Sequence, residues 1–246
     1  MKQLRITSII AWILISFSIN VSSARAQNAN TSSTNSERGS DLIQRDGRRT
    51  AGGDRGTCPA MKNVNDALTA FVAEKGNSLT LSDSPTLLFY APYVSNSPIN
   101  AKFSLQNDDG YNVIKPPIML KLSGTPGIIK IPVPKSLEKG KYYRWSLAIT
   151  CDSEDQSKNP GVHGWVKQVE SSPNLISQLQ KRLSKRELAT VYRKEGLLLD
   201  ALALLVEIRN QDIQAKNDWN SLLKSLDLEV YAENKVVEYY TQLVSK

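Results

Sequence analysis

Two acidic segments are the first candidates for chemistry in this chain. Asp108 and Asp109 precede a glycine, and Asp152, Glu154 and Asp155 lie close together in a second polar segment. Two carboxyl groups that face each other can act as the acid and the base or nucleophile of a glycoside hydrolase. Carboxylates gathered in one loop can instead bind calcium, which prefers oxygen ligands. The residues therefore support two hypotheses: a hydrolase that uses these loop carboxylates, and a calcium site at the second segment.

Other catalytic signatures in the sequence are weak. Ser136 and Ser221 each stand three residues before a lysine, but the companion motifs of serine acyltransferases do not occur. The chain has one histidine, His163, and two cysteines, which is too few for a zinc set of both. No HExxH helix and no glycine-rich phosphate loop occurs. We therefore assign no catalytic residue and no cofactor, and no metal beyond the calcium candidate.

The first 26 residues predict export. Lys2 and Arg5 give a positive start, residues 6–21 form an uncharged apolar run, and residues 24–26 have the A-x-A form of a cleavage site. This is the layout of a secretory signal peptide, so residues 1–26 predict a periplasmic or secreted protein. No later segment is long and apolar enough to span a bilayer, and we expect no transmembrane span after cleavage.

The predicted exported location guides how the net charge and the two cysteines are interpreted. Removing the three basic residues of the signal lowers the formal charge from +7 to +4, a mild bias that favours an anionic envelope surface over nucleic acid. The two cysteines, Cys58 and Cys151, predict one disulfide, because an isolated pair in an oxidising compartment most often forms a bond. That bond would stabilise the fold by about 4 kcal/mol in the chain-entropy description.

Residues 27–57 differ in composition from the rest of the chain. They are rich in Asn, Ser, Thr, Gly and Arg and carry few apolar side chains, which predicts a disordered linker. Four arginines cluster near its end: Arg45, Arg48, Arg49 and Arg55. They are compatible with an anion-binding arm or with a solvated tail, and we prefer the solvated tail.

Residues 58–170 predict a β-sandwich with one disulfide. A helix is expected over residues 61–74, and short strands with turn signals between them come next. The clearest strand is residues 142–152, in which apolar and polar side chains alternate. Several such strands in succession favour an antiparallel sandwich.

From residue 171 the pattern becomes helical. Ser172 precedes a proline, and Ser184 stands three residues before Glu187, which are two signals of helix starts. Amphipathic helices are also expected at residues 218–226 and 230–244. The predicted fold class is therefore α+β, an immunoglobulin-like antiparallel β-sandwich followed by a C-terminal helical hairpin or bundle over residues 171–246.

The helical region resembles one tetratricopeptide unit. The positions that carry the resemblance are Leu188, Ala189, Tyr192, Gly196 and Ala201, with Trp219 and Leu222 at the start of the next 34-residue repeat. A generic helical hairpin explains these residues equally well. The resemblance implies a role in packing or in protein contact.

The strand region resembles the end of periplasmic immunoglobulin-like sandwiches. In those folds a tyrosine near a strand start anchors a corner through its hydroxyl group. Tyr142 and Tyr143 are both placed for this role in the sequence. The copper chemistry of some such sandwiches does not carry over, because it needs several histidines or a methionine-rich stretch.

An ordered set of short motifs gives a more specific resemblance. The motifs are Arg55-Gly56-Thr57-Cys58, Pro85-Thr86 with Phe89-Tyr90-x-Pro92-Tyr93, Leu137-Glu138-x-Gly140-Lys141-x-Tyr143-x-Trp145, Cys151-Asp152, Gly164-Trp165-Val166, Tyr192-x-x-x-Gly196 with Asp200-Ala201-Leu202, and Trp219-x-x-Leu222-Leu223. Over about residues 55–226 the chain resembles the exported cyanobacterial family known only as a domain of unknown function (DUF928-like). The resemblance implies export, a sandwich with paired cysteines and a helical tail, but no activity.

These observations predict a non-enzymatic binding or adaptor protein of the cell envelope. Its expected partner is an envelope protein and not nucleic acid, and the sequence leaves the oligomeric state open. The expected contact surface is the helical tail together with exposed aromatic residues. The aromatic candidates are Tyr90, Tyr93, Trp165, Tyr192 and Trp219. The alternative function is an envelope glycan or peptidoglycan hydrolase that uses the loop carboxylates.

Overall fold

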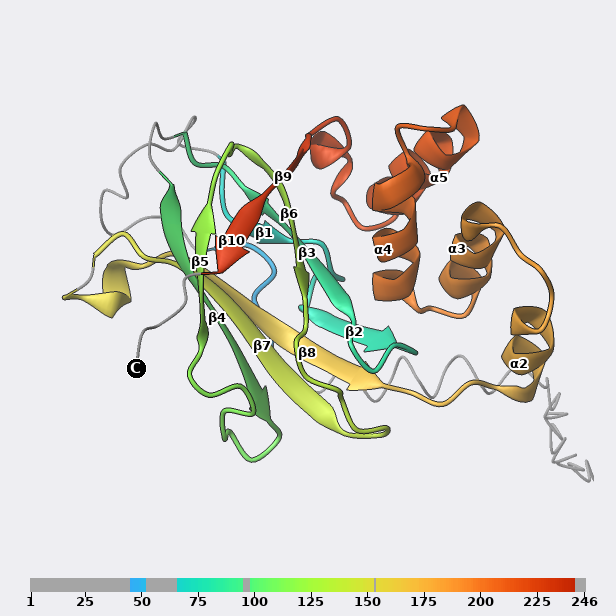
Figure 1. The fold of residues 1–246 in the computed structure, drawn as a ribbon, viewed down its shortest axis with the longest axis horizontal. Helices are drawn as coiled ribbons and strands as arrows, with labels where there is room; N and C mark the ends of the chain where they lie inside the picture. The colour runs from blue at the N-terminus through green and yellow to red at the C-terminus, as the bar shows by residue number, and fades with distance from the viewer. Residues whose placement is uncertain (1–44, 52–65, 95–97, 153, 242–246) are drawn as a thin grey trace, which may run out of the picture. The chain divides into compact units, whose positions relative to one another are not determined.

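The computed structural model describes residues 45–51, 66–94, 98–152 and 154–241, all within one compact unit. The predicted signal peptide and Cys58 lie outside the described residues. The described part folds into two β-sheets and four α-helices, which confirms the α+β class (Figure 1).

The larger sheet has six strands in the order β10-β5-β4-β7-β8-β2. Their bounds are β2 (Asn77–Thr80), β4 (Ile99–Asn107), β5 (Ile118–Leu122), β7 (Tyr142–Ile149), β8 (Gly161–Gln168) and β10 (Tyr239–Thr241). Neighbouring strands are antiparallel except at one edge, where β2 runs parallel to β8. The strand expected over residues 142–152 is confirmed as β7, which ends at Ile149.

The smaller sheet has four strands in the order β1-β3-β6-β9. Their bounds are β1 (Thr69–Ala70), β3 (Thr86–Ala91), β6 (Gly127–Pro132) and β9 (Val236–Val237). Strand β9 runs parallel to β6 at the sheet edge. The expectation of an antiparallel, immunoglobulin-like sandwich is therefore wrong in one respect, because each sheet has one parallel edge pair and immunoglobulin sheets are antiparallel.

The two sheets pack face to face through the inward side chains of their central strands. Phe103 on β4 and Trp145 on β7 are completely buried, as is Phe89 on β3. The rings of Phe89 and Trp145 meet edge to face with centroids 5.6 Å apart, a geometry that aromatic pairs favour. This contact joins the two sheets at the centre of the sandwich core.

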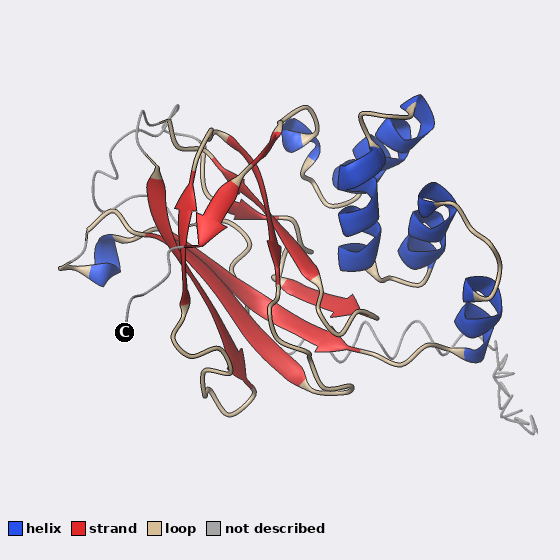
Figure 2. Ribbon diagram, in the orientation of Figure 1, coloured by secondary structure: helices blue, strands red, loops and turns tan. Residues whose placement is uncertain are grey.

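The last two helices form a third layer on the other face of the four-stranded sheet, and the first two pack beside them (Figure 2). Their bounds are α2 (Pro173–Leu179), α3 (Lys185–Lys194), α4 (Leu198–Ile208) and α5 (Ile213–Lys224). Leu88 and Tyr90 on β3 pack against Trp219 on α5 in a second core cluster. The two expected helix starts are confirmed, since Ser172 caps α2 and Ser184 forms a capping box with Glu187 on α3.

The chain returns from the helices to the sandwich at its C-terminal end. The expected helix over residues 230–244 is wrong for the described residues, which form the 3-10 turn η2 (Glu229–Tyr231) and then β9 and β10. The buried Arg209 holds this return, because its guanidinium donates to the carbonyl groups of Ala232 and Asn234 at 2.7 and 2.5 Å. Strands β9 and β10 then extend one edge of each sheet.

An N-terminal segment, residues 45–51, pairs with β8 of the larger sheet and with β1 of the smaller sheet, on the side away from β9 and β10. Arg48 and His163 exchange backbone hydrogen bonds at 2.7 and 3.0 Å, and Thr50 forms a bridge with Thr69. The expectation of a solvated tail is therefore wrong for this segment. Pairing of this kind covers backbone groups that a bare sheet edge would leave exposed.

The helix expected over residues 61–74 is also wrong in its described part. Residues 66–74 contain β1 and a turn, and Leu68, Ala70 and Phe71 are fully buried. A short segment that is buried on all sides shows closely spaced apolar residues whether it is a strand or a helix. Burial against both core clusters, rather than a helical face, explains the apolar pattern.

Candidate functional site

The outer face of the six-stranded sheet, which we call the sheet face, carries a basic surface. Its outward positions are Asn100, Lys102, Ser104 and Gln106 on β4, Met119 and Lys121 on β5, Tyr142, Arg144, Ser146 and Ala148 on β7, and Gly161, His163, Trp165 and Lys167 on β8. None of these positions is acidic, and four are lysine or arginine. Period-two alternation places them all on one side of the sheet, opposite the buried core.

Three cationic or titratable groups converge at the middle of the sheet face. Arg48 lies directly opposite His163 in the cross-strand pair, and Arg144 lies on the neighbouring strand β7. Burial lowers the pKa of His163, and the positive charges of Arg144 and Arg48 lower it further. No ion pair joins Arg48 or Arg144 to a carboxylate among the described residues.

A stacked cation and two aromatic rings close one end of the sheet face. The guanidinium of Arg45 lies 3.8 Å from the ring centre of Tyr142 and 4.6 Å from that of Trp165. The same guanidinium forms a two-point ion pair with Asp108, which raises the pKa of Arg45. The indole N–H of Trp165 donates to the carbonyl group of Asp46 at 3.1 Å. Arg45 is therefore a fixed structural element of the site.

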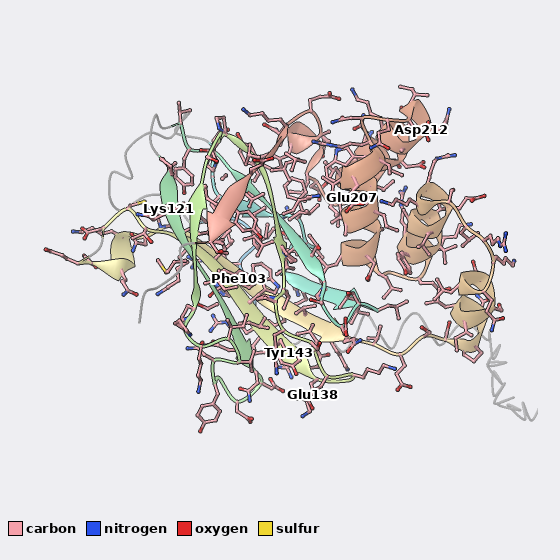
Figure 3. The ribbon with its side chains drawn as sticks, viewed as in Figure 1. Phe103, Lys121, Glu138, Tyr143, Glu207 and Asp212 are labelled. Carbon is pink, nitrogen blue, oxygen red and sulfur yellow. The ribbon has the colours of Figure 1, made fainter. Side chains whose placement is uncertain are left out.

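A cleft of about 550 Å³ opens beside this aromatic end. It is lined by Asn107, Asp108, Asp109, Val113, Lys135, Glu138, Gly140, Lys141, Tyr142 and Tyr143. Glu138 and Tyr143 lie together at this end of the sheet (Figure 3), where the Glu138 backbone N–H donates to the Tyr143 hydroxyl at 3.2 Å. Of the two tyrosines proposed as a corner anchor, the structure selects Tyr143.

The carboxylates of the cleft are each held by a neighbour. Asp108 pairs with Arg45, and Asp109 accepts a hydrogen bond from the side chain of Asn107 at 3.2 Å. Glu138 pairs with Lys141 at 2.6 Å, and this contact lowers the pKa of Glu138. A glycosidase acid needs the opposite shift, toward a higher pKa.

The second acidic segment is organised around its own lysine. Asp152 accepts hydrogen bonds from the backbone N–H groups of Glu154 and Asp155, and Asp155 accepts one from Ser157. Asp152 and Asp155 both approach the ammonium group of Lys158, at 3.2 and 3.4 Å. These contacts lower the pKa of both aspartates. Lys158 thus pairs with both aspartates of the calcium candidate, and the described residues contain no cluster of three metal-binding side chains.

The two acidic segments lie at opposite ends of the six-stranded sheet. Asp108 follows the end of β4 that pairs with the start of β7, whereas Asp152 follows the end of β7. Strand β7 has eight residues, so at about 3.3 Å per residue the segments are about 26 Å apart. The two carboxyl groups of a glycosidase are separated by at most about 9.5 Å. The segments therefore cannot supply one carboxylate each to a hydrolase site.

The aromatic contact residues expected from the sequence divide into two groups. Tyr90, Tyr93 and Trp219 are buried, with exposed fractions of 5, 1 and 0 %, so their place in the expected contact surface is wrong. Each belongs to a core cluster, where large rings contribute most to packing. Trp165 and Tyr192 are half-buried and reach the surface.

Tyr192 lines a second, smaller cleft of about 190 Å³ between α3, α4 and the loop after β2. At its base, Asp200 on α4 accepts hydrogen bonds from the Thr80 hydroxyl at 3.0 Å and from the Leu81 backbone N–H at 3.2 Å. Burial raises the pKa of Asp200. This carboxylate ties the helical layer to the end of β2.

Sequence reasoning did not assign Arg144 and Lys102 to a site, and it named Arg48 without placing it on the sheet. The alternation of β7 places Arg144 on the polar face in the sequence alone. The partners of that strand, however, depend on the sheet order, which the sequence does not specify. The arginine cluster before residue 57 was a second signal, compatible with an anion-binding arm or with the solvated tail that we preferred.

The comparisons with known proteins place the chain in a family. None of the described helices has the length and apolar content needed to cross a membrane. No curated protein matches the sequence. The family described as Domain of Unknown Function (DUF928) matches residues 50–236, which is most of the chain and includes strands β1 to β8 and all four described helices. The chain therefore belongs to the DUF928 family.

Proposed function

We propose that this protein is an exported, non-enzymatic binding or adaptor protein of the cell envelope that works through the sheet face. The observation that carries the proposal is the run of outward residues on β4, β5, β7 and β8, which combines cations, hydroxyl groups and aromatic rings without a carboxylate. Surfaces of one charge attract partners of the opposite charge and speed their association.

The helical layer has a different role in this proposal. Helices α4 and α5 bury their apolar side chains against β3, so they stabilise the four-stranded sheet. That packing uses Trp219, which the sequence had suggested as a contact residue. The sheet face, on the far side of the sandwich core, therefore replaces the helical tail as the expected contact surface.

The state of the loop carboxylates supports binding over hydrolysis. The pKa of Glu138, Asp152 and Asp155 is lowered in each case by a hydrogen-bonding or cationic neighbour. A carboxyl group with a lowered pKa stays ionised at neutral pH and is a poor proton donor. These residues therefore favour a role in fixing the loops.

Site-specific photo-cross-linking in the native envelope tests the proposal. A photoreactive residue at Ser146, in the middle of the sheet face, is compared with one at the exposed Thr190 on α3. We expect Ser146 to capture an envelope component and Thr190 to capture little. Capture from Thr190 alone would return the contact surface to the helices, and capture from neither position would contradict a binding function in the envelope.

A further inference from the structure

We propose that the sheet face binds an acidic polysaccharide, a polymer of sugars that carry carboxylate or sulfate groups. This inference rests on the proposed function and names its ligand class. It depends on how the cations are arranged on the sheet.

The register of the sheet distributes positive charge evenly along the strands. Cross-strand pairing arranges the outward residues in five successive rows, and each row contains one lysine or arginine. The rows are Asn100–Lys121, Met119–Lys102–Ala148–Gly161, Ser104–Ser146–His163–Arg48, Gln106–Arg144–Trp165 and Tyr142–Lys167. Same-face rows recur at two-residue intervals, or about 7 Å. The cations lie on different strands, from Lys121 on β5 to Arg48 beside β8, so the positive charge is spread across the sheet as well as along it.

The small side chains of the central rows allow a polymer to approach the sheet. Ser104, Ser146 and Ala148 stand between the longer cationic side chains, and Gly161 has no side chain. The serine hydroxyl groups can both donate and accept hydrogen bonds, which suits the hydroxyl groups of sugars. A shallow floor with hydroxyl groups and a surrounding ring of cations therefore fits a hydroxylated anionic polymer.

Arg48 and Arg144 are the best candidates for direct contact with acidic groups. Both side chains are exposed and neither is paired with a carboxylate of the described residues. Arginine binds carboxylate and sulfate groups through two parallel N–H donors, which makes it stronger and more selective than a lysine point charge. Arg45 differs from them because its guanidinium is already paired with Asp108.

The ligand class is inferred from the combination of charge, hydroxyl groups and a predicted exported location. Nucleic acid would also be attracted by the charge, but an exported protein seldom meets it. A protein partner would need large apolar anchors at the centre of the contact, and the middle row consists of Ser104, Ser146, His163 and Arg48. An acidic glycan fits the positive charge, the hydroxyl groups and the predicted exported location.

Polygalacturonate, a polymer of carboxylated sugars, is a suitable probe, and neutral dextran is its control. The test variant is Arg48→Gln with Arg144→Gln, and the matched control is Lys181→Gln with Lys194→Gln, which removes two exposed charges from the helical layer. Each arginine contact with a carboxylate contributes about tenfold to affinity. We expect the full chain to bind polygalacturonate but not dextran, with a loss of about one hundredfold in the test variant and less than about twofold in the control.

Several outcomes would overturn the inference. Equal loss in the two double variants would show that net charge alone is responsible. Equal binding of dextran, or displacement of polygalacturonate by equal charge concentrations of DNA or of anionic lipid vesicles, would contradict selection for an acidic glycan. If polygalacturonate is not bound but Ser146 still cross-links to an envelope protein, the glycan inference fails and the proposed function stands. Thermal unfolding of each variant shows whether the fold is intact.

Discussion

Asp200 provides a sharp test of how the helical layer is held to the sandwich. Its carboxylate accepts hydrogen bonds from the Thr80 hydroxyl and the Leu81 N–H, and Thr80 has an exposed fraction of 0 %. Replacement of Asp200 by alanine leaves both donors without this acceptor. A buried polar group that loses its partner costs about 1–3 kcal/mol. Alanine also removes a buried charge, which offsets part of this cost, so we expect Asp200→Ala to lower the free energy of unfolding by about 2 kcal/mol at neutral pH.

Asparagine at the same position gives the matched comparison. Its amide oxygen can accept from the Leu81 N–H while its amide N–H donates to the Thr80 hydroxyl, which can also act as an acceptor. The asparagine variant also removes a buried negative charge, which is unfavourable in a low-dielectric site. We therefore expect Asp200→Asn to change the free energy of unfolding by less than about 1 kcal/mol at neutral pH.

The pH dependence of stability, compared between the wild type and Asp200→Asn, shows whether the charge of Asp200 stabilises or destabilises the fold. Burial raises the pKa of Asp200 above its ordinary value of 3.8, so the folded protein holds this proton more tightly than the unfolded chain. The contribution of Asp200 to stability is therefore fully present below pH 3.8 and is lost as the pH rises through the folded pKa. Relative to the wild type, the asparagine variant should gain stability as the pH rises from about 4 to 7.

Urea unfolding of the wild type and both variants at several pH values measures these differences. If asparagine were as destabilising as alanine at pH 7, the two hydrogen bonds would not be satisfied as described. If the gap between wild type and the asparagine variant did not change with pH, Asp200 would not be penalised by burial. Either result would refute the reasoning.

Three further predictions concern the corner tyrosine, the C-terminal return of the chain and the two cysteines. Tyr143→Phe removes the hydroxyl that accepts from the Glu138 N–H and should lower the free energy of unfolding by about 1 kcal/mol, measured by urea titration, whereas an unchanged midpoint would contradict the corner anchor. Arg209→Met removes the guanidinium donors to the carbonyl groups of Ala232 and Asn234, of which Ala232 still accepts from the Trp219 indole N–H. The change should cost about 2 kcal/mol and accelerate amide hydrogen exchange in β9, whereas unchanged exchange would show that another contact holds the C-terminal return. The mature protein should contain no titratable thiol after non-reducing denaturation, and two free thiols would contradict the predicted Cys58–Cys151 disulfide.

The sequence predicted the elements whose structure depends on neighbouring residues, namely strand β7 and the starts of α2 and α3. The alternation of residues 142–152 gave the correct faces of β7, because its inward side chains are all buried whereas those from Arg144 to Ala148 on the other side are exposed or half-buried. The serine caps of α2 and α3 were also predictable, since a side chain that satisfies backbone N–H groups acts within one helical turn.

The elements that depend on distant partners were not predictable in this way. Residues 230–241 carry apolar side chains near helical spacing. They form η2, β9 and β10 instead, because Arg209 binds the backbone after η2 and the edges of both sheets offer strand partners. Tyr90 and Trp219 were expected at the surface because the sequence did not reveal a third layer against β3. Tertiary packing decided each of these cases over local pattern.

In the candidate site, too, the features set by neighbouring residues were predictable and those set by distant partners were not. The sequence identified the arginine cluster and the polar face of residues 142–152, but not the fact that Arg48 pairs opposite His163. That pairing joins residues far apart in the chain, and it depends on which strand lies at the sheet edge. The acidic segments were conspicuous in the sequence, but the fold pairs Asp108 with Arg45, and Asp152 and Asp155 with Lys158.

Retention of the protein by the isolated cell envelope is the most direct test of the central claim. The comparison is between the wild type, Arg144→Glu on the sheet face and Lys194→Glu on the exposed surface of α3, which change the net charge equally. The account predicts that the wild type and Lys194→Glu stay with the envelope fraction and that Arg144→Glu is released. Retention of Arg144→Glu, or equal release of both variants, would contradict the sheet face as the binding surface.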